Sequence, residues 1–328
     1  MVVGGGVPPR QIKSKVEIKM SEQIFVDRTT TWHAIGKDVQ ECKDMEQVLK
    51  ASGLDYEVEK RQVFMLNPDG STVAIPNRFT TVRMSDNHPY DVVSDKFEII
   101  QNRDAFDFVN YMGEDLQFEK AGETQSGMVY IIGKLPEVNI LGDAFVPHVI
   151  FRNGFNGKTK ITAAITPLRL VCQNQFNFAF KNAQNAITIR HVRNAESKLE
   201  EAKETLRMCA DYMQELTTMA ERFAAMKITA DRAERITKYL FPIPEDTAIN
   251  AFKRKSLETS REKFIAAINA EDNRNFKGTA WGMINAYTDF ITHKDPAGKR
   301  EDRFEGKFVN TTFKVSMNPI VNAIEAIA

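Results

Sequence analysis

Alternating apolar and polar positions run through the first half of the chain and indicate β-strands. Residues 78–84 alternate in this way and are followed by a polar, proline-containing turn. Residues 127–134 are apolar and rich in β-branched side chains, as in a buried strand. The pattern from residue 25 to about residue 193 therefore predicts mostly strands with short helices.

Two further strand-like runs, 146–155 and 158–166, flank the pair Asn156-Gly157. This pair favours the two-residue type I′ turn of a β-hairpin, because both central residues need a positive φ. The turn would place the phenylalanine before it opposite the lysine after it. One face of the hairpin would then be apolar and the other aromatic and cationic, unless its phenylalanines are ordinary packing residues of a two-sided sheet.

Thr166 and Pro167 together predict the start of a helix. Threonine caps helix N-termini, and proline suits the first helical position, where its missing N–H would have no intrahelical partner. A helix over residues 167–183 would bury its apolar positions and turn Arg169 and Lys181 toward solvent or a ligand. The resulting order is strand, hairpin, helix.

The pattern changes at Glu196 to helical periodicity. Apolar residues recur there at alternating spacings of three and four and form a heptad seam on one helix. The seam consists of Leu199, Ala202, Leu206, Cys209, Met213, Leu216, Ala220 and Phe223. Residues 231–240, 248–270, 279–293 and 318–328 also have helical patterns. An intramolecular bundle is the favoured cover for the seam, and a coiled coil between subunits is the alternative.

These patterns predict an α+β protein in which an antiparallel sheet with a strand–hairpin–helix core is followed by a helical bundle. With 328 residues the chain is long enough for more than one core. We expect a flexible tail over residues 1–24, an α+β domain over 25–195 and a helical domain over 196–294. A charged loop and a C-terminal helix would follow over 295–328.

Charge is distributed unevenly along the chain. Basic and acidic residues number 44 each, yet no acidic residue lies between Asp143 and Glu196, where the chain average would give about seven. Seven basic residues fall in the same interval, namely Arg152, Lys158, Lys160, Arg169, Lys181, Arg190 and Arg193. Together with the phenylalanines and amides between them they suit a nucleic acid, because cations neutralise phosphate and aromatic rings stack on bases. The alternative is a buried strand pair and helix whose cations pair with acids elsewhere.

The sequence gives little sign of catalysis or of a bound metal or cofactor. Its three cysteines lack metal-ligand spacing and predict reduced thiols, and no phosphate-binding loop or nucleophile elbow is present. Asp302, Glu305 and Lys307 faintly resemble the carboxylate–lysine set of metal-dependent nucleases, although a solvated charge run is the favoured interpretation. No run approaches 18 apolar residues, so we expect no membrane span. We predict a protein that is not an enzyme and has no metal or cofactor.

Four motifs in order carry a family resemblance. They are WHAIG at 32–36, YDVVS at 90–94 followed by IQN at 100–102, TPLRLVCQN at 166–174, and IRH at 189–191. Over roughly residues 31–293 the chain resembles a widespread phage- and plasmid-encoded family known under a domain-of-unknown-function label. That family has no settled activity that the resemblance could transfer.

A second resemblance is at the level of fold. The predicted order of strand, hairpin and helix is similar to the core of single-strand annealing proteins of the Rad-fifty-two and Red beta type. This similarity implies a homo-oligomeric ring or filament that holds single-stranded DNA (ssDNA) in a basic groove. We therefore expect ATP-independent ssDNA binding and annealing in recombination or replication of a phage or plasmid, in the cytoplasm of the bacterial host.

The residues expected to contact DNA are those of the acid-free interval. They are Arg152, Phe155, Lys158, Lys160, Arg169, Lys181, Arg190 and Arg193. The cations would contact phosphates and Phe155 would stack on a base. A phage structural or assembly protein, and a metal-dependent DNA-processing enzyme, are the alternatives.

Overall fold

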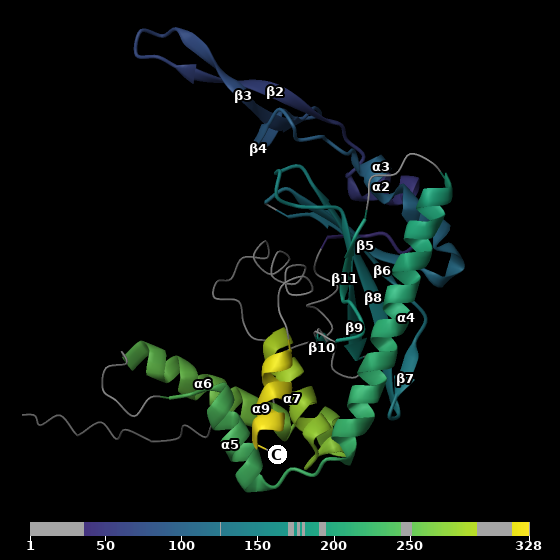
Figure 1. Cartoon of the computed structure of the whole chain (residues 1–328), viewed down its shortest axis with the longest axis vertical. Coiled ribbons are helices and arrows are strands. Elements are labelled where there is room, and N and C mark those ends of the chain that lie inside the picture. Colours follow the sequence, from purple (N-terminus) through teal and green to yellow (C-terminus); the bar gives the residue numbers. More distant parts are fainter. Residues whose placement is uncertain are drawn as a thin grey trace, which may run out of the picture.

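The computed structural model describes residues 36–124, 126–169, 174–175, 178, 181–189, 195–243, 251–293 and 317–327. The predicted tail therefore lies outside the described residues. Strands come first and helices follow, so the predicted α+β class is confirmed. Figure 1 shows a three-stranded sheet at one end, a larger sheet in the middle and a group of helices at the other end.

The larger sheet is antiparallel and has eight strands in the part of the chain that the structure describes. They are β1 (Lys37–Asp38), β5 (Gln117–Glu123), β6 (Met128–Lys134), β7 (Val138–Ile140), β8 (Asp143–Gly154), β9 (Thr162–Arg169), β10 (Asn174–Gln175) and β11 (Ala186–Thr188). The main order is β1-β5-β6-β8-β9-β10, with β7 paired to β8 and β11 to β9. The central strand β6 is buried on both faces, which explains its uninterrupted apolar sequence.

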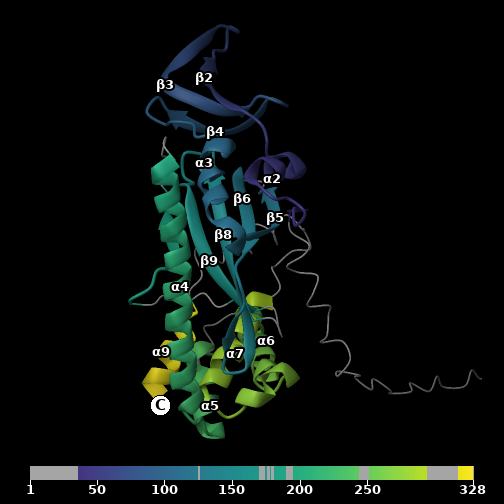
Figure 2. The same cartoon turned by 90° about the vertical axis from the view of Figure 1, so that its right-hand side faces the viewer.

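Helices cover one face of this sheet. They are α2 (Met45–Ser52), α3 (Asn102–Phe106), the 3-10 turns η1 (Asp107–Tyr111) and η2 (Gly113–Asp115), and the first half of α4 (Ala195–Ala225). Figure 2 shows α4 running along the side of the sheet. Packing between the layers includes an edge-on contact of the Phe108 and Phe151 rings, with centroids 5.6 Å apart.

A three-stranded sheet projects from the end of the molecule that lies opposite the group of helices (Figure 1). Its strands are β2 (Val58–Leu66), β3 (Thr72–Arg83) and β4 (His88–Ser94), in the order β2-β3-β4. The predicted strand at 78–84 coincides with the second half of β3 and extends one residue beyond its end, whereas the rest of the β2–β3 hairpin was not predicted. The end of the β2–β3 hairpin, residues 62–75, extends well beyond the larger sheet and is called the arm below (Figure 1).

The helical group follows α4 along the chain. It contains α5 (Ala230–Leu240), α6 (Ala251–Ile268), the 3-10 turn η3 (Glu271–Phe276), α7 (Ala280–His293) and α9 (Asn318–Ile327). These helices confirm the predicted ones to within a few residues. Helix α7 lies at the centre and contacts α4, α6 and α9, with Trp281 and Ile284 completely buried.

Most of the heptad seam of α4 is covered from within the chain, although Leu199 at its start is 38% exposed. Its second half, including Leu216, Ala220 and Phe223, is completely buried, and α4 contacts α7. Its first half lies against η1 and the larger sheet, where Ala202 and Cys209 are buried. The structure thus agrees with the favoured interpretation, in which α4 packs within its own chain. Only the second half of the seam packs in a bundle, because the first half packs on a sheet.

The predicted two-residue hairpin turn is wrong. Strands β8 and β9 pair with Arg152 opposite Thr162, so seven residues, 155–161, connect them. Gly157 does have the expected positive φ of 68°. Asn156 does not; its side-chain oxygen instead accepts hydrogen bonds from the backbone N–H groups of Lys158 and Thr159, an Asx turn.

The predicted helix start at Thr166-Pro167 is also wrong, because both residues belong to β9. Pro167 lies directly opposite Pro147 of β8. The carbonyl of Pro147 accepts a 2.9 Å hydrogen bond from the backbone N–H of Leu135, on the side away from β9, so the two prolines form a non-hydrogen-bonded pair. Neither residue at such a position donates a bond to the opposite strand, and the prolines therefore remove none. The first long helix after the hairpin, in the part of the chain described, is α4, and the strand–hairpin–helix order at residues 127–183 is not found.

Candidate nucleic-acid interface

Two cations of the acid-free interval lie on the exposed connection between β8 and β9. Lys158 is 81% exposed, and its Nζ lies 2.9 Å from a carboxylate oxygen of Asp91 on β4. Lys160 is exposed as well. An exposed ion pair of this kind is weak, so Lys158 can exchange Asp91 for a phosphate at small cost.

Arg169 is not a surface residue, contrary to the prediction. It is only 2% exposed, and Nε and a terminal nitrogen lie 2.7 and 2.6 Å from Oδ2 of the buried Asp143. The guanidinium also donates a hydrogen bond of 2.9 Å to the backbone carbonyl of Asp272 in η3. Arg169 therefore ties β9 to the helical group, and it was misassigned because the predicted helix would have turned it outward.

Phe155 is not available for base stacking either. Its ring is completely buried, with centroid distances of 6.1 Å to Tyr56 and 5.4 Å to Tyr90. Its backbone carbonyl accepts a 2.7 Å hydrogen bond from the hydroxyl of Thr81. The alternative that this phenylalanine is a packing residue is therefore the correct one, and it holds the three-stranded sheet against the larger sheet.

The remaining predicted contacts fall into three groups. Arg152 is half-buried and donates a 2.5 Å hydrogen bond to the Thr162 hydroxyl, and burial lowers the pKa of its guanidinium. Lys181 is exposed, but it lies beside Asn182, whose amide bonds to α4, and not beside the β8–β9 connection. Arg190 and Arg193 lie outside the described residues.

The tyrosines around Phe155 form a cluster with Arg83 and Glu123. The Arg83 guanidinium lies 5.0 Å from the centre of the Tyr56 ring and donates a 2.7 Å hydrogen bond to Glu123. Burial, and then the Glu123 carboxylate, raise the pKa of Tyr56 to about 12, and burial also raises the pKa of Tyr90. Because Arg83 and Tyr90 belong to the three-stranded sheet and Glu123 to the larger one, the cluster joins the two sheets.

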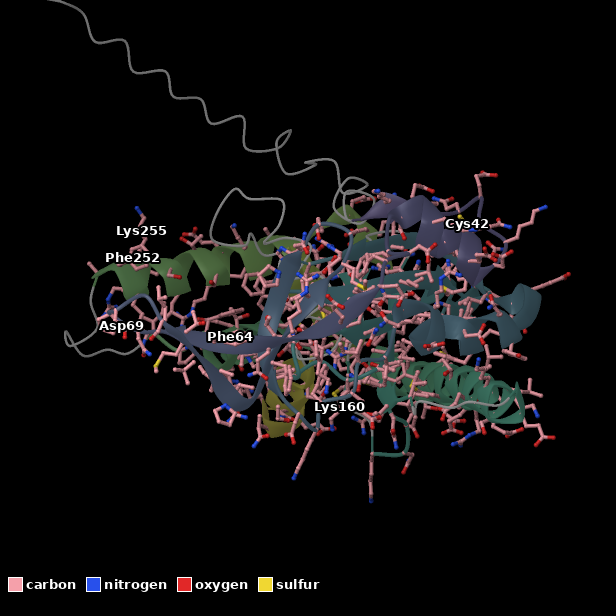
Figure 3. The ribbon with its side chains drawn as sticks, turned by 90° about the horizontal axis from the view of Figure 1, so that it is seen from above. Cys42, Phe64, Asp69, Lys160, Phe252 and Lys255 are labelled. Carbon is pink, nitrogen blue, oxygen red and sulfur yellow. The ribbon has the colours of Figure 1, made fainter. Side chains whose placement is uncertain are left out.

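Helix α6 carries the surface that the sequence analysis missed. Phe252 is 85% exposed, and Lys255, Ser256, Thr259 and Lys263 are exposed on the same face, at helical spacings from it. These side chains, with Ser260 and Phe290, line a cavity of about 320 Å³. Figure 3 shows Phe252 and Lys255 directed outward at one extremity of the molecule.

The net charge of α6 is positive, in agreement with the exposed lysines on this face. It contains five basic and two acidic residues within Ala251–Ile268. The signal in the sequence is the run Phe252-Lys253-Arg254-Lys255, in which an aromatic residue precedes three cations. This run lies outside the acid-free interval, and the apolar periodicity around it predicts only a helix of a bundle.

The arm and α6 project toward the same side of the molecule. In Figure 1 both extend to the left of the larger sheet, the arm at the top and α6 at the bottom. Seen from above in Figure 3, Asp69 of the arm and Phe252 of α6 again lie at the same extremity. Any long ligand or partner approaching this side meets both elements.

Features of other site types are not found in the described part of the chain. Among these residues no group of three or more His, Cys, Asp and Glu side chains could hold a metal ion. No helix among them is both long and apolar enough to span a membrane. The acidic residues Asp302 and Glu305 with Lys307 lie outside the described ranges.

Comparison with known proteins gives a family and no activity. No curated protein and no solved structure gives a significant match to the chain. The family model described as "Domain of unknown function (DUF932)" matches residues 89–311, which include the YDVVS motif, β8, β9 and all of α4 to α7. Because this match covers more than half of the chain, the protein belongs to the DUF932 family.

Proposed function

We propose that this protein binds and anneals single-stranded DNA without ATP, in the recombination or replication of a phage or plasmid within a bacterial cell. The observation that carries the proposal is the exposed face of α6, which Phe252 shares with Lys255 one turn away and with Lys263 farther along the helix. An aromatic ring that bases can stack on, next to cations that neutralise phosphate, is what sequence-independent ssDNA binding requires.

The α6 face offers the three kinds of contact that a single strand needs. The Phe252 ring supplies a stacking surface, Lys255 and Lys263 supply positive charge, and the hydroxyls of Ser256 and Thr259 can donate hydrogen bonds to phosphate oxygens. Duplex DNA keeps its bases stacked on one another and cannot use the ring. The face therefore favours single strands over duplex.

Lys158 and Lys160 support a longer DNA path. They are exposed on the β8–β9 connection, and no acidic residue other than Asp91 pairs with either of them among the described residues. Their contribution would be electrostatic, since the aromatic residue beside them, Phe155, is buried. We assign base stacking to α6 and additional phosphate contacts to the β8–β9 connection.

The test is fluorescence anisotropy with a labelled oligothymidine and its duplex, measured across a salt series, together with annealing of complementary strands without ATP. We expect tighter binding of the single strand, an affinity that falls with salt, and faster annealing than without protein. An absence of ssDNA binding at low salt would refute the proposal. Cleavage of the strands in Mg²⁺ would identify a DNA-processing enzyme instead.

The arm favours one alternative, a phage structural or assembly protein. Its apolar side chains are exposed at the end of a projection, as in proteins that assemble through extended contacts. Light scattering separates the alternatives when it is combined with the anisotropy measurement. An assembly protein would form large complexes of defined size and show no preference for single strands over duplex.

A further inference from the structure

The arm exposes an unusual amount of apolar surface. Five of its apolar side chains are more than one-third exposed: Phe64, Met65, Leu66, Val73 and Ile75. Leu66 reaches 72%. Phe64 and Leu66 lie on one face of the hairpin, and Met65, Val73 and Ile75 lie on the other, so both faces are apolar. Exposed apolar groups of this kind mark a surface suited to contact with another protein, because their exposure to water is unfavourable.

The arm is also built as a defined structure. Strands β2 and β3 pair up to Leu66 opposite Thr72, and the backbone of Asn67 donates a 2.9 Å hydrogen bond to the carbonyl of Ser71 across the turn. The Asp69 carboxylate accepts bonds from the backbone and hydroxyl of Ser71. A preorganised hairpin gives up little conformational freedom when it docks.

The helical group contains an apolar cavity that could receive such a hairpin. It lies between α5, α6, η3 and α7 and has a volume of about 540 Å³, within the roughly 300–1,000 Å³ of pockets that bury ligand groups. Its apolar lining is Ile228, Ala233, Ile265, Ile268 and Met283. Ile265 is 49% exposed, so the cavity opens to the surface.

Charge complements this apolar match. Asp69 is the only charged residue of the arm. The cavity is lined by the cations Lys238, Arg261 and Lys277 and by one acid, Glu234, which pairs with Lys238. A hairpin with apolar sides and one negative charge at its tip therefore meets an apolar cavity with a net positive rim.

The arm and the cavity of one chain cannot meet each other. The arm lies at the end of the molecule opposite α5, with the larger sheet between them (Figure 1). We propose that the arm of one copy docks into the cavity between α5, α6 and α7 of a second copy. Because the two surfaces differ, the contact is head-to-tail, and repetition of it gives a ring or a filament.

This inference deepens the proposed function, since it rests on the assembly of subunits, but it does not require that they bind DNA. Docking would place the arm of one copy close to α6 of the next, because α6 forms one wall of the cavity. The Phe252 faces of successive copies would then be repeated along the assembly. A continuous series of stacking sites suits a protein that holds a strand open for annealing.

Two single substitutions and their mixture test the interface. Leu66→Asp places a charge on the arm, and Ile265→Asp places one at the cavity. Both side chains are about half exposed or more, so we expect folded proteins with unchanged circular dichroism. Light scattering should show an oligomer for the parent and a single subunit for each variant.

The mixture is the decisive sample. The Leu66→Asp variant keeps an intact cavity and the Ile265→Asp variant keeps an intact arm, so an equimolar mixture should form a dimer of one copy of each and nothing larger. The proposal would be overturned if the two variants were monomeric and stayed monomeric when mixed. It would also be overturned if the parent were a monomer at tens of micromolar, or if either variant formed the same oligomer as the parent.

The same variants separate this inference from the proposed function. Both keep Phe252 and Lys255, so a monomeric variant that still binds labelled oligothymidine supports both proposals. A parent that assembles through the arm but fails to bind the oligonucleotide refutes the DNA-binding proposal alone. A parent that binds the oligonucleotide as a monomer refutes the arm–cavity contact alone.

Discussion

The β8–β9 region and helix α6 carry similar residue types and use them differently. In the β8–β9 region Phe155 is buried between two tyrosines, and Arg169 forms a buried ion pair with Asp143. On α6, Phe252 and Lys255 are exposed on one helical face. A segment without Asp or Glu is therefore not necessarily a positively charged surface. A basic residue in the segment can be buried in an ion pair with an acidic residue at the end of the segment, as Arg169 is with Asp143.

The different burial of the phenylalanines and cations in these two regions follows from the topology of the fold. Strands β8 and β9 are central in an antiparallel sheet covered by helices, so aromatic residues near their ends are drawn into the core. Helix α6 packs on α7 through one face only and leaves the other to solvent. Substitutions in the first region should change stability, and those in the second should change binding.

One of the two largest effects should follow Arg169→Ala. This substitution leaves the Asp143 carboxylate buried without its partner, which typically costs about 3–5 kcal/mol. Urea unfolding measures the change, and Lys181→Ala serves as the control, because Lys181 is exposed and its removal should change the unfolding free energy by less than about 0.5 kcal/mol. Equal stability of the two variants would mean that the Arg169–Asp143 pair does not form.

Alanine substitution of Phe155 and of Phe252 should show directly that the first ring stabilises the fold and the second does not. Phe155→Ala removes a completely buried ring from between Tyr56 and Tyr90 and should lower the unfolding free energy by about 3–5 kcal/mol. Phe252→Ala removes an exposed ring and should leave stability within about 0.5 kcal/mol of the parent. A stable Phe155→Ala variant would contradict the assignment of this ring to the core.

A smaller destabilisation should follow Gly157→Val on the β8–β9 connection. Gly157 has a φ of 68°, and an added Cβ would lie 3.2 Å from Cγ1 of Val93. We therefore expect the unfolding free energy to fall by about 1–2 kcal/mol. Gly70→Val in the arm is the matched control, because Gly70 also has a positive φ but has open space around it. The difference between the two unfolding free energies reports the contact with Val93, and a larger destabilisation by Gly70→Val would rule that contact out.

The smallest effect should come from the lysines of the same connection. Lys158→Ala and Lys160→Ala each remove one cation that we expect to bind a phosphate, so each should flatten the dependence of log affinity on log salt by about 0.7 on single strands. Neither substitution should alter the unfolding free energy measurably, since both side chains are exposed. An unchanged salt slope would confine the proposed interface to α6.

The sequence predicted elements better than their connections. Periodicity alone located β6 and the helices α5, α6, α7 and α9, because each satisfies its own local pattern. The turn at Asn156 and the helix at Pro167 failed because local signals competed with pairing between distant residues. The opposition of Pro147 and Pro167 depends on the register of two strands, which no local rule contains.

The candidate site was predictable only in part. Lys158 and Lys160 are exposed as predicted, although they lie on the β8–β9 connection and not on the predicted strand. The burial of Phe155 depends on Tyr56 and Tyr90, which are distant from it in sequence. Phe252 precedes three cations in the sequence, which is a visible signal. Whether such a phenylalanine packs inward or outward is decided by the helix that α6 packs against, and the sequence does not identify that helix.

The most direct test of the account is the ssDNA affinity of Phe252→Ala, measured by anisotropy with labelled oligothymidine beside the parent. Removal of one stacking ring should weaken binding by about 1–3 kcal/mol, or roughly 5- to 150-fold, without changing the salt slope, because no charge is removed. Lys255→Ala in parallel should flatten the slope instead. Parent-like affinity for Phe252→Ala, in a protein that binds single strands, would contradict the claim that α6 is the stacking surface.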